Sequence, residues 1–403
     1  MMTRRVLLLV LIVSCAHALV HTFELALPAV EQQIADQYFP DDAARGKLVN
    51  GWMAYGWRLP LGIGALVAGF LVDRFGARRM LGIYLIGCGA MCVAVGLGPP
   101  LPALFTVMVI MGTFACIYHP AGLALISHET TIDNRARALG IHGIFGSLGI
   151  GSAPFMAGAV LTICSWLSIE RSWQVFYLVL AVPGIALGIF FIYLHILHRN
   201  EKITRPDEST AVNDAEDFTS WRSYFLLAAY AGLMGCTYAG VLAFLPRYMD
   251  GANITLPYVP PEGTRNVLAG SVLLIGCLAQ YIAGRFARHH LLEIQQASIS
   301  LSTVPFLLWM AVAEGPWRVV ATSCFALIHF MHQPVFNSLI SKYTPRSHRS
   351  RCYGLCFAMG LGVGSLGAVY AGYFQDNFIV YGTLAGVATI SGSLSLILWR
   401  WNR

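Results

Sequence analysis

Twelve apolar stretches, each long enough to cross a bilayer as a helix, fill most of this chain. A membrane-spanning helix needs about 20 mainly apolar residues, and in lipid such a helix satisfies all of its own backbone hydrogen bonds. We therefore predict an all-α membrane protein with twelve transmembrane helices. The expected spans are residues 6–30, 48–72, 78–98, 101–127, 137–165, 172–198, 221–248, 265–288, 294–313, 316–341, 350–374 and 377–400.

The composition agrees with this prediction and excludes several functions. Only 11% of the residues are charged and 57% are hydrophobic, whereas an average soluble domain has about 25% charged residues. No basic patch is interleaved with aromatic residues, so nucleic acid is not an expected partner. The sequence has no GxxxxGK[ST] loop, so ATP is not the expected energy source. We expect no cofactor and no enzymatic activity.

A second constraint is an internal repeat. Pro120 and Arg135 recur as Pro334 and Arg349, each 214 positions further on. A period of about half the chain is too long for a solenoid array. Two such units in a membrane protein are typical of a transporter whose site lies between them.

The repeat predicts two pseudo-symmetric six-helix bundles joined by one polar segment. We place the bundles at residues 1–198 and 221–403, and a linker on the cytoplasmic side at 199–220. This segment contains six acidic and three basic residues, which is typical of a solvated connector.

The lysines and arginines predict the orientation, because cytoplasmic segments carry an excess of them. With the N-terminus inside, nineteen of the 26 fall in inner segments and six in outer segments, and Arg58 lies within a span. We therefore expect both termini to be cytoplasmic, in a bacterial inner (plasma) membrane. We expect the protein to be a monomer.

The segment between the second and third spans reads Gly69-x3-Asp73-Arg74-x-Gly76-x-Arg78-Arg79. It resembles the signature loop of the major facilitator superfamily. The second half carries only a degraded copy, in which Gly284 stands where Asp73 would be. The predicted gating residues of this loop are Asp73, Arg74, Gly76 and Arg78.

The resemblance implies alternating access of two bundles, with spans one, four, seven and ten around a central cavity. His119-Pro120 in span four and the histidines of span one also resemble the fosmidomycin-resistance group of drug exporters. The resemblance implies a secondary transporter that exports a small organic or drug-like solute and couples this export to protons.

Ionisable residues inside spans are costly and usually face a cavity, so they supply the candidate site. Span one offers His17, His21 and Glu24, whose spacing of four and three puts them on one helix face. We predict proton coupling for these three. The predicted substrate-binding residues are Arg58, Tyr118, His119, His329, His332, Gln333 and Asn337.

Arg58 has three interpretations at this stage. It pairs with Glu24 as a structural ion pair, or it holds an anionic group of the substrate under control of Glu24 protonation, or it extends toward the outer interface. The histidines also have three interpretations. They form hydrogen bonds across helices, or they form a proton relay with Glu24 as carrier, or they ligate a divalent metal ion. We assign no metal site from sequence, because helical spacing alone often generates such pairs.

The function expected from these features is proton-coupled export of a small organic solute, with an anionic group on it. The first alternative is an importer or symporter of an organic anion, of a metal ion or of a metal chelate. The second is a membrane receptor that binds the solute without transporting it. Fold alone does not decide among substrates.

Overall fold

The computed structural model describes residues 3–197, 219–286, 288–345 and 348–402. Most of the chain in these ranges is helical, and none of them contains a strand. The helices are α1 Arg4–Tyr38, α2 Ala43–Phe75, α3 Ala77–Gly96, α4 Leu101–Ala115, α5 Tyr118–Glu129, α6 Ile132–Trp166, α7 Ser172–Leu197, α8 Trp221–Leu242, α9 Leu245–Asp250, α10 Pro261–Phe286, η1 His289–Leu291, α11 Leu292–Val312, α12 Trp317–His329, α13 His332–Tyr343, α14 Arg349–Phe357, η3 Ala358–Gly362, η4 Val363–Ser365, α15 Leu366–Tyr373 and α16 Asn377–Trp401.

Within the described part of the chain, twelve helical segments are long and apolar enough to span a membrane. This confirms the predicted fold class and number of spans. The two largest differences from the predicted boundaries lie at the ends of the first and seventh spans. α1 continues to Tyr38, so Glu31 lies in a helix and is only 2% exposed rather than standing in an outer loop. The seventh span ends at Leu242, and the short helix α9 follows it.

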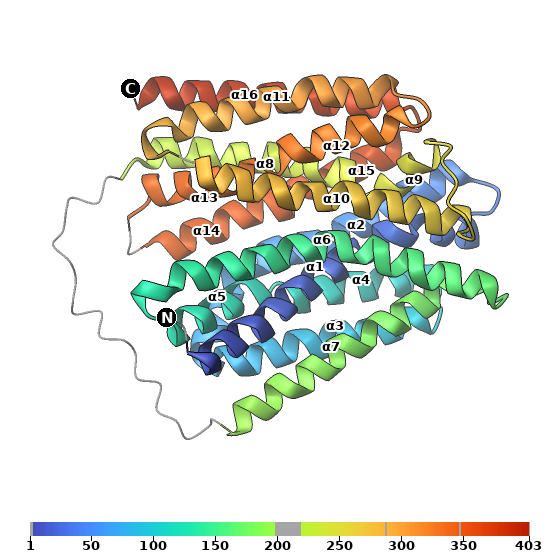
Figure 1. The fold of residues 1–403 in the computed structure, drawn as a ribbon, viewed down its shortest axis with the longest axis horizontal. Helices are drawn as coiled ribbons and strands as arrows, with labels where there is room; N and C mark the ends of the chain where they lie inside the picture. Colours follow the sequence, from blue (N-terminus) through green and yellow to red (C-terminus); the bar gives the residue numbers. More distant parts are fainter. Residues whose placement is uncertain (1–2, 198–218, 287, 346–347, 403) are drawn as a thin grey trace.

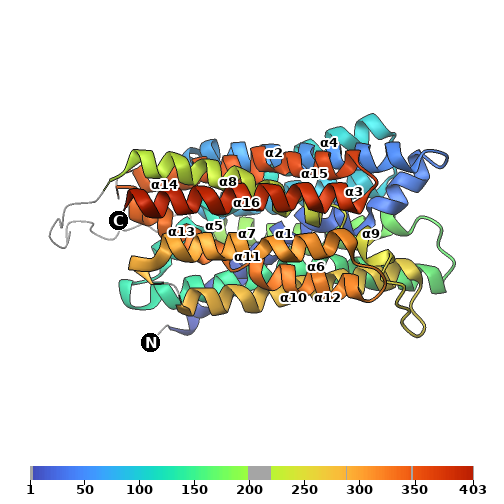
Figure 2. The ribbon, with the colours of Figure 1, turned by 90° about the horizontal axis from the view of Figure 1, so that it is seen from above.

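The helices α1–α7 and α8–α16 form two groups that lie side by side (Figure 1), and the view from above shows the helices running along a common direction (Figure 2). The start of α1 and the end of α16 lie at the same end of the molecule, on the left in both views. The predicted linker 199–220 lies outside the described residues except for Thr219 and Ser220.

Spans four and ten break at equivalent places. α4 ends before the cap residue Cys116, and α12 ends before the cap residue Phe330, 214 positions later. Each break lies four residues before a proline, Pro120 or Pro334. Proline has no N–H to donate to the carbonyl four residues back, and its ring clashes with that carbonyl. The prolines therefore account for both breaks, and each break is followed by a pair of polar or aromatic residues at the start of the next helix.

The repeated arginines make the same contacts in both halves. Arg135 Nη2 donates to the carbonyl oxygens of Ser127 and Thr130, at 2.9 and 3.3 Å. Arg349 Nη2 donates to the carbonyls of residues 341 and 344, at 3.0 and 3.2 Å. These arginines hold the last carbonyls of α5 and α13, which a helix end leaves without partners. The sequence repeat is thus a structural repeat.

Most polar contacts between α1–α7 and α8–α16 lie at the end opposite the chain termini, although Ser147 also donates to Gln280 at 2.7 Å nearer the middle of α6. Arg247 on α9 donates to both carboxylate oxygens of Glu31, each at 2.7 Å. Lys47 donates to the carbonyl of Phe374 at 2.6 Å, and Asn266 to the carbonyl of Ala29 at 2.9 Å. These contacts close that end of the molecule.

Candidate functional site

Arg58 and Glu24 form a buried pair between α1 and α2. The side chains are 2% and 1% exposed, and Arg58 Nη2 lies 3.2 Å from Glu24 Oε1. The pair lacks hydrogen-bond geometry, however. Among the described residues, neither Nη1 nor Nη2 of Arg58 has an acceptor, and Glu24 Oε1 has no donor. The interpretation that Arg58 extends to the outer interface is wrong, because its side chain is buried.

The next layer of the site is made by histidines of α1. His21 Nδ1 lies 2.8 Å from Glu24 Oε2, so Glu24 uses one oxygen for His21 and presents the other to Arg58. His17, one turn earlier, places its Nδ1 at 2.8 Å from the carbonyl oxygen of His142 on α6. The helical spacing thus brings the three predicted proton-coupling residues to one face of α1, as expected.

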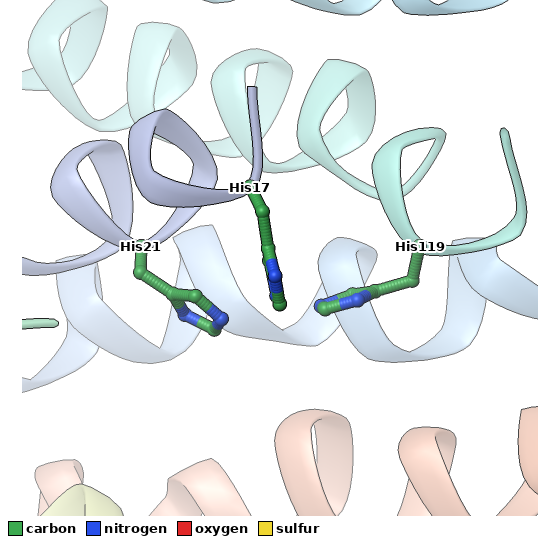
Figure 3. A group of neighbouring side chains, drawn as sticks. All are labelled: His17, His21 and His119. Carbon is green, nitrogen blue, oxygen red and sulfur yellow. The ribbon is translucent and has the colours of Figure 1, made fainter. Parts of the chain in front are cut away.

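His119 completes a group of three histidines. Its ring points from α5 toward the rings of His17 and His21 (Figure 3), at centroid distances of 5.6 and 5.8 Å. One ring nitrogen of each histidine lies within 4.8 Å of the others. All three side chains are partly buried. The break before α5 places His119 in its first turn, where it faces α1.

His142 also belongs to this group, although it was not among the predicted site residues. Its ring stacks on that of His17, with centroids 4.1 Å apart, and its carbonyl orients His17. Gly146, one turn on, leaves room for the His17 ring, because a Cβ there would lie 2.3 Å from a ring carbon. A histidine within an apolar span is the same signal that identified the others.

Three aromatic residues enclose the site. Tyr118 is fully buried, and its hydroxyl donates to the carbonyl of Val13. Tyr238 on α8 lies under the guanidinium of Arg58, with Cζ 5.0 Å from the ring centroid. Phe357 on α14 stacks on His119 at 5.3 Å. Tyr238 and Phe357 belong to the second half of the chain, so the site lies between the two halves.

The residues predicted from span ten form a separate group. His329 is fully buried, and neither ring nitrogen has a partner within the described structure. Its ring lies 6.4 Å from that of Tyr238, which connects it to Arg58. His332 places Nδ1 at 2.6 Å from the carbonyl of His329. Gln333 and Asn337 are partly buried, one turn apart on α13.

The predicted gating loop lies at the end that holds the chain termini. Gly76 has φ +86°, a conformation that favours glycine, and it separates α2 from α3. Arg78 pairs with Glu129 on α5. Asp73 and Arg74 are exposed, and across the described ranges no hydrogen bond or ion pair joins Asp73 to another side chain. The loop therefore does not bridge the two halves in this conformation.

Twelve membrane-length helices, a repeated half and a buried polar site between the halves define a polytopic membrane protein of the transporter class. The sequence model of the Major Facilitator Superfamily matches residues 9–368. The chain therefore belongs to this superfamily. Its family and its fold are those of transporters rather than enzymes.

Two curated relatives are named for different functions. The chain is 25% identical over 304 residues to the "Probable L-galactonate transporter" of Escherichia coli (strain K12), covering 67% of this chain and 65% of that protein. It is 24% identical over 244 residues to the "Tetracenomycin C resistance and export protein" of Streptomyces glaucescens, covering 58% and 44%. The matched segments thus span less than two thirds of either relative's length.

A solved structure is similar over nearly the whole chain. The inward-open conformation of the xylose transporter XylE from E. coli matches with a TM-score of 0.73 and 12% identity, covering 98% of this chain and 95% of that one. At this identity the likeness shows the fold alone. It supports the same arrangement of helices.

Proposed function

We propose that the protein is a secondary transporter that moves a small organic anion together with protons, by alternating access around Arg58. The observation that carries this proposal is the incomplete satisfaction of a buried guanidinium. Arg58 is 2% exposed, and its two terminal nitrogens lack acceptors among the described residues. A buried charge whose donors are unsatisfied is costly.

A carboxylate or phosphate group on the solute would satisfy these nitrogens. The planar guanidinium matches such groups with two parallel hydrogen bonds. Tyr238 beneath the guanidinium, and His329 beyond it, come from the second half of the chain. A solute held by Arg58 would therefore contact both halves, as alternating access requires. We extend this role to His332, Gln333 and Asn337, and assign Tyr118 to positioning the histidines of α1.

The pair also suggests how protons are coupled. Ionised Glu24 competes with the solute for Arg58, because both are anions beside one cation. Protonation of Glu24 removes this competitor, so the proton and the anion bind together. Binding of both to the same state is symport, and a proton gradient directed inward would then drive uptake. His21, whose Nδ1 lies 2.8 Å from Glu24, supplies a route for the proton, because an imidazole can accept a proton at one ring nitrogen and donate from the other.

The competition between ionised Glu24 and the solute for Arg58 favours the symporter alternative over the proton-driven export expected from sequence. Export by exchange would need the solute and the proton to exclude each other at the site. The superfamily relatives include a galactonate transporter and an exporter. L-galactonate carries a carboxylate, which agrees with the guanidinium of Arg58 as the group that binds the solute.

A binding experiment tests the proposal before any substrate is known. Purified protein would be screened for thermal stabilisation by a panel of small carboxylates and organic phosphates, because a ligand of the folded state raises its stability. We expect hits that stabilise more strongly at low pH than at high pH. Arg58→Gln should abolish the stabilisation. Glu24→Gln, a neutral carboxamide, should keep it and remove its pH dependence. Stabilisation that survives Arg58→Gln contradicts the proposal.

A second candidate function is transport of a divalent metal ion or its chelate, favoured by the three histidines. Two of them have Nδ1 held by an acceptor, the carbonyl of His142 and the carboxylate of Glu24, which leaves Nε2 to bind a metal. Ring nitrogens that lie within 4.8 Å of one another would place an ion at most about 2.8 Å from each, against roughly 2.0–2.1 Å in zinc sites. The rings would have to close by at most several tenths of an ångström.

Equilibrium dialysis of tag-free protein against Zn²⁺ separates the two functions. The metal hypothesis predicts one bound ion, which is lost in His119→Ala and retained in His128→Ala. His128 is the matched control, because it lies on the same helix and is exposed. Equal binding by the two variants, or none by the native protein, excludes the metal function.

A further inference from the structure

A cavity of about 160 Å³ lies at the end of the molecule opposite the chain termini, separate from Arg58. It is enclosed by the start of α2, the short helix α9, and the starts of α12 and α16. Figure 1 shows α9 and these helix starts at the right-hand end. The polar residues of its lining are Lys47, Arg247, Tyr248, Arg318, Gln375 and Asn377.

The charges around this cavity do not balance. Three of its lining residues are cationic and none is acidic. Arg247 is neutralised by Glu31, with both carboxylate oxygens at 2.7 Å. Lys47 and Arg318 take part in no ion pair within the described ranges, which leaves two positive charges without a carboxylate.

The partners of Lys47 and Arg318 are backbone carbonyls, which accept hydrogen bonds but carry no net charge. Lys47 is 6% exposed, and its Nζ donates to the carbonyl of Phe374 at 2.6 Å. Arg318 donates from Nε to Ala313 and from Nη1 to Tyr248, at 3.2 and 3.1 Å. An ammonium has three donors and a guanidinium five, so both side chains retain donors for a further acceptor.

The α16 helix adds to the positive potential. Asn377 is its first residue and lines the cavity. The N-terminus of a 25-residue helix carries a partial positive charge and favours anions. The nearest acidic side chain on this element, Asp376, is exposed and caps the helix through the N–H of Phe378.

We propose that this cavity is a binding site for a small oxyanion, of carboxylate or phosphate size, held between Lys47 and Arg318. Its volume corresponds to about five water molecules at roughly 30 Å³ each, which suits such an ion. A drug-sized pocket has about 300–1,000 Å³, so this cavity is smaller than a pocket for a drug-sized solute. The site does not depend on what Arg58 binds.

The anion would connect the two halves. Lys47 belongs to the first half, and Arg318 and Asn377 belong to the second. An anion between them adds to the Glu31–Arg247 and Lys47–Phe374 contacts that close this end. A bound anion therefore stabilises the conformation that is closed at this end. When this end opens, Lys47 and Arg318 separate and the anion site is lost.

Thermal unfolding of the purified protein in nanodiscs of zwitterionic lipid tests the site. Phosphate and acetate would each be titrated at constant ionic strength. A bulky sulfonate, which is too large for the cavity, serves as the control anion. We expect a saturable rise in Tm with the native protein. Lys47→Met and Arg318→Met should raise the half-saturating concentration at least tenfold, whereas Arg318→Lys keeps part of the response.

Arg45→Met is the matched control, because Arg45 lies two residues from Lys47 on the same helix but is exposed. It should retain the native response. Nanodiscs that contain anionic lipid distinguish a headgroup from a free ion, since an occupying headgroup raises the initial Tm and reduces the effect of phosphate. The absence of a saturable rise in zwitterionic lipid, or equal half-saturation in Lys47→Met and Arg45→Met, overturns the proposal.

Discussion

Arg58 and Glu24 lie in contact at 3.2 Å with both side chains buried, yet the contact provides neither with a hydrogen bond. Removing one partner of a buried ion pair typically costs about 3–5 kcal/mol, because the other charge is left alone. This arrangement keeps a cation in the membrane while leaving its donors available.

The first prediction concerns the stability of this pair. Arg58→Met should destabilise the protein by about 3–5 kcal/mol, because Glu24 is left buried without a cation. Arg58→Met combined with Glu24→Met should be less destabilised than Arg58→Met alone. Chemical unfolding of the two single variants and the double variant measures the coupling. Additive effects would show that the two charges do not interact.

A second prediction concerns the contacts at the closed end. Arg247→Gln removes the partner of Glu31, which is 2% exposed, and should shift the protein toward the conformation open at that end. A cysteine placed at Tyr238 in a cysteine-free background should then be modified faster by a thiol reagent added from that side. Arg45→Gln, which removes an exposed charge of the same end, should leave the rate unchanged. Unchanged labelling in Arg247→Gln would mean that the ion pair does not hold this end.

A third prediction compares two glycines of α6. A Cβ on Gly146 would overlap the His17 ring at 2.3 Å, whereas a Cβ on Gly143 meets nothing within 4 Å. Gly146→Ala should lower the thermal stability and displace His17 from His142. Gly143→Ala should be neutral or slightly stabilising, because alanine favours a helix by up to about 1 kcal/mol over glycine. Equal effects of the two variants would contradict the packing described for His17.

The fold was predictable because the membrane imposes a simple rule on sequence. Each span must be apolar and about as long as the bilayer is thick, so the twelve spans follow from hydropathy, and the repeat follows from the 214-residue period. Gly146 and Gly149 pack closely against α1, whereas a Cβ on Gly143 would meet nothing within 4 Å. Sequence spacing does not show which side of a helix faces a neighbour.

The site was predictable only in part. Charged and histidine residues within spans gave Glu24, Arg58 and His119, because polar groups in lipid are rare. Tyr238 and Phe357 were not identified as site residues, since aromatic residues are common in apolar spans and their role depends on how the two halves meet. The predicted first span ends at residue 30, just before Glu31, whereas α1 continues to Tyr38 and Arg247, 216 positions after Glu31, compensates its charge.

The most direct test of the central claim is the direction of proton movement during solute transport. Protein would be reconstituted in liposomes that contain a pH-sensitive dye, and a carboxylate found by the stability screen would be added outside. The account predicts that uptake of the solute acidifies the interior, and that Glu24→Gln still exchanges solute without moving protons. Alkalinisation of the interior during uptake, or an unchanged proton flux in Glu24→Gln, would contradict it.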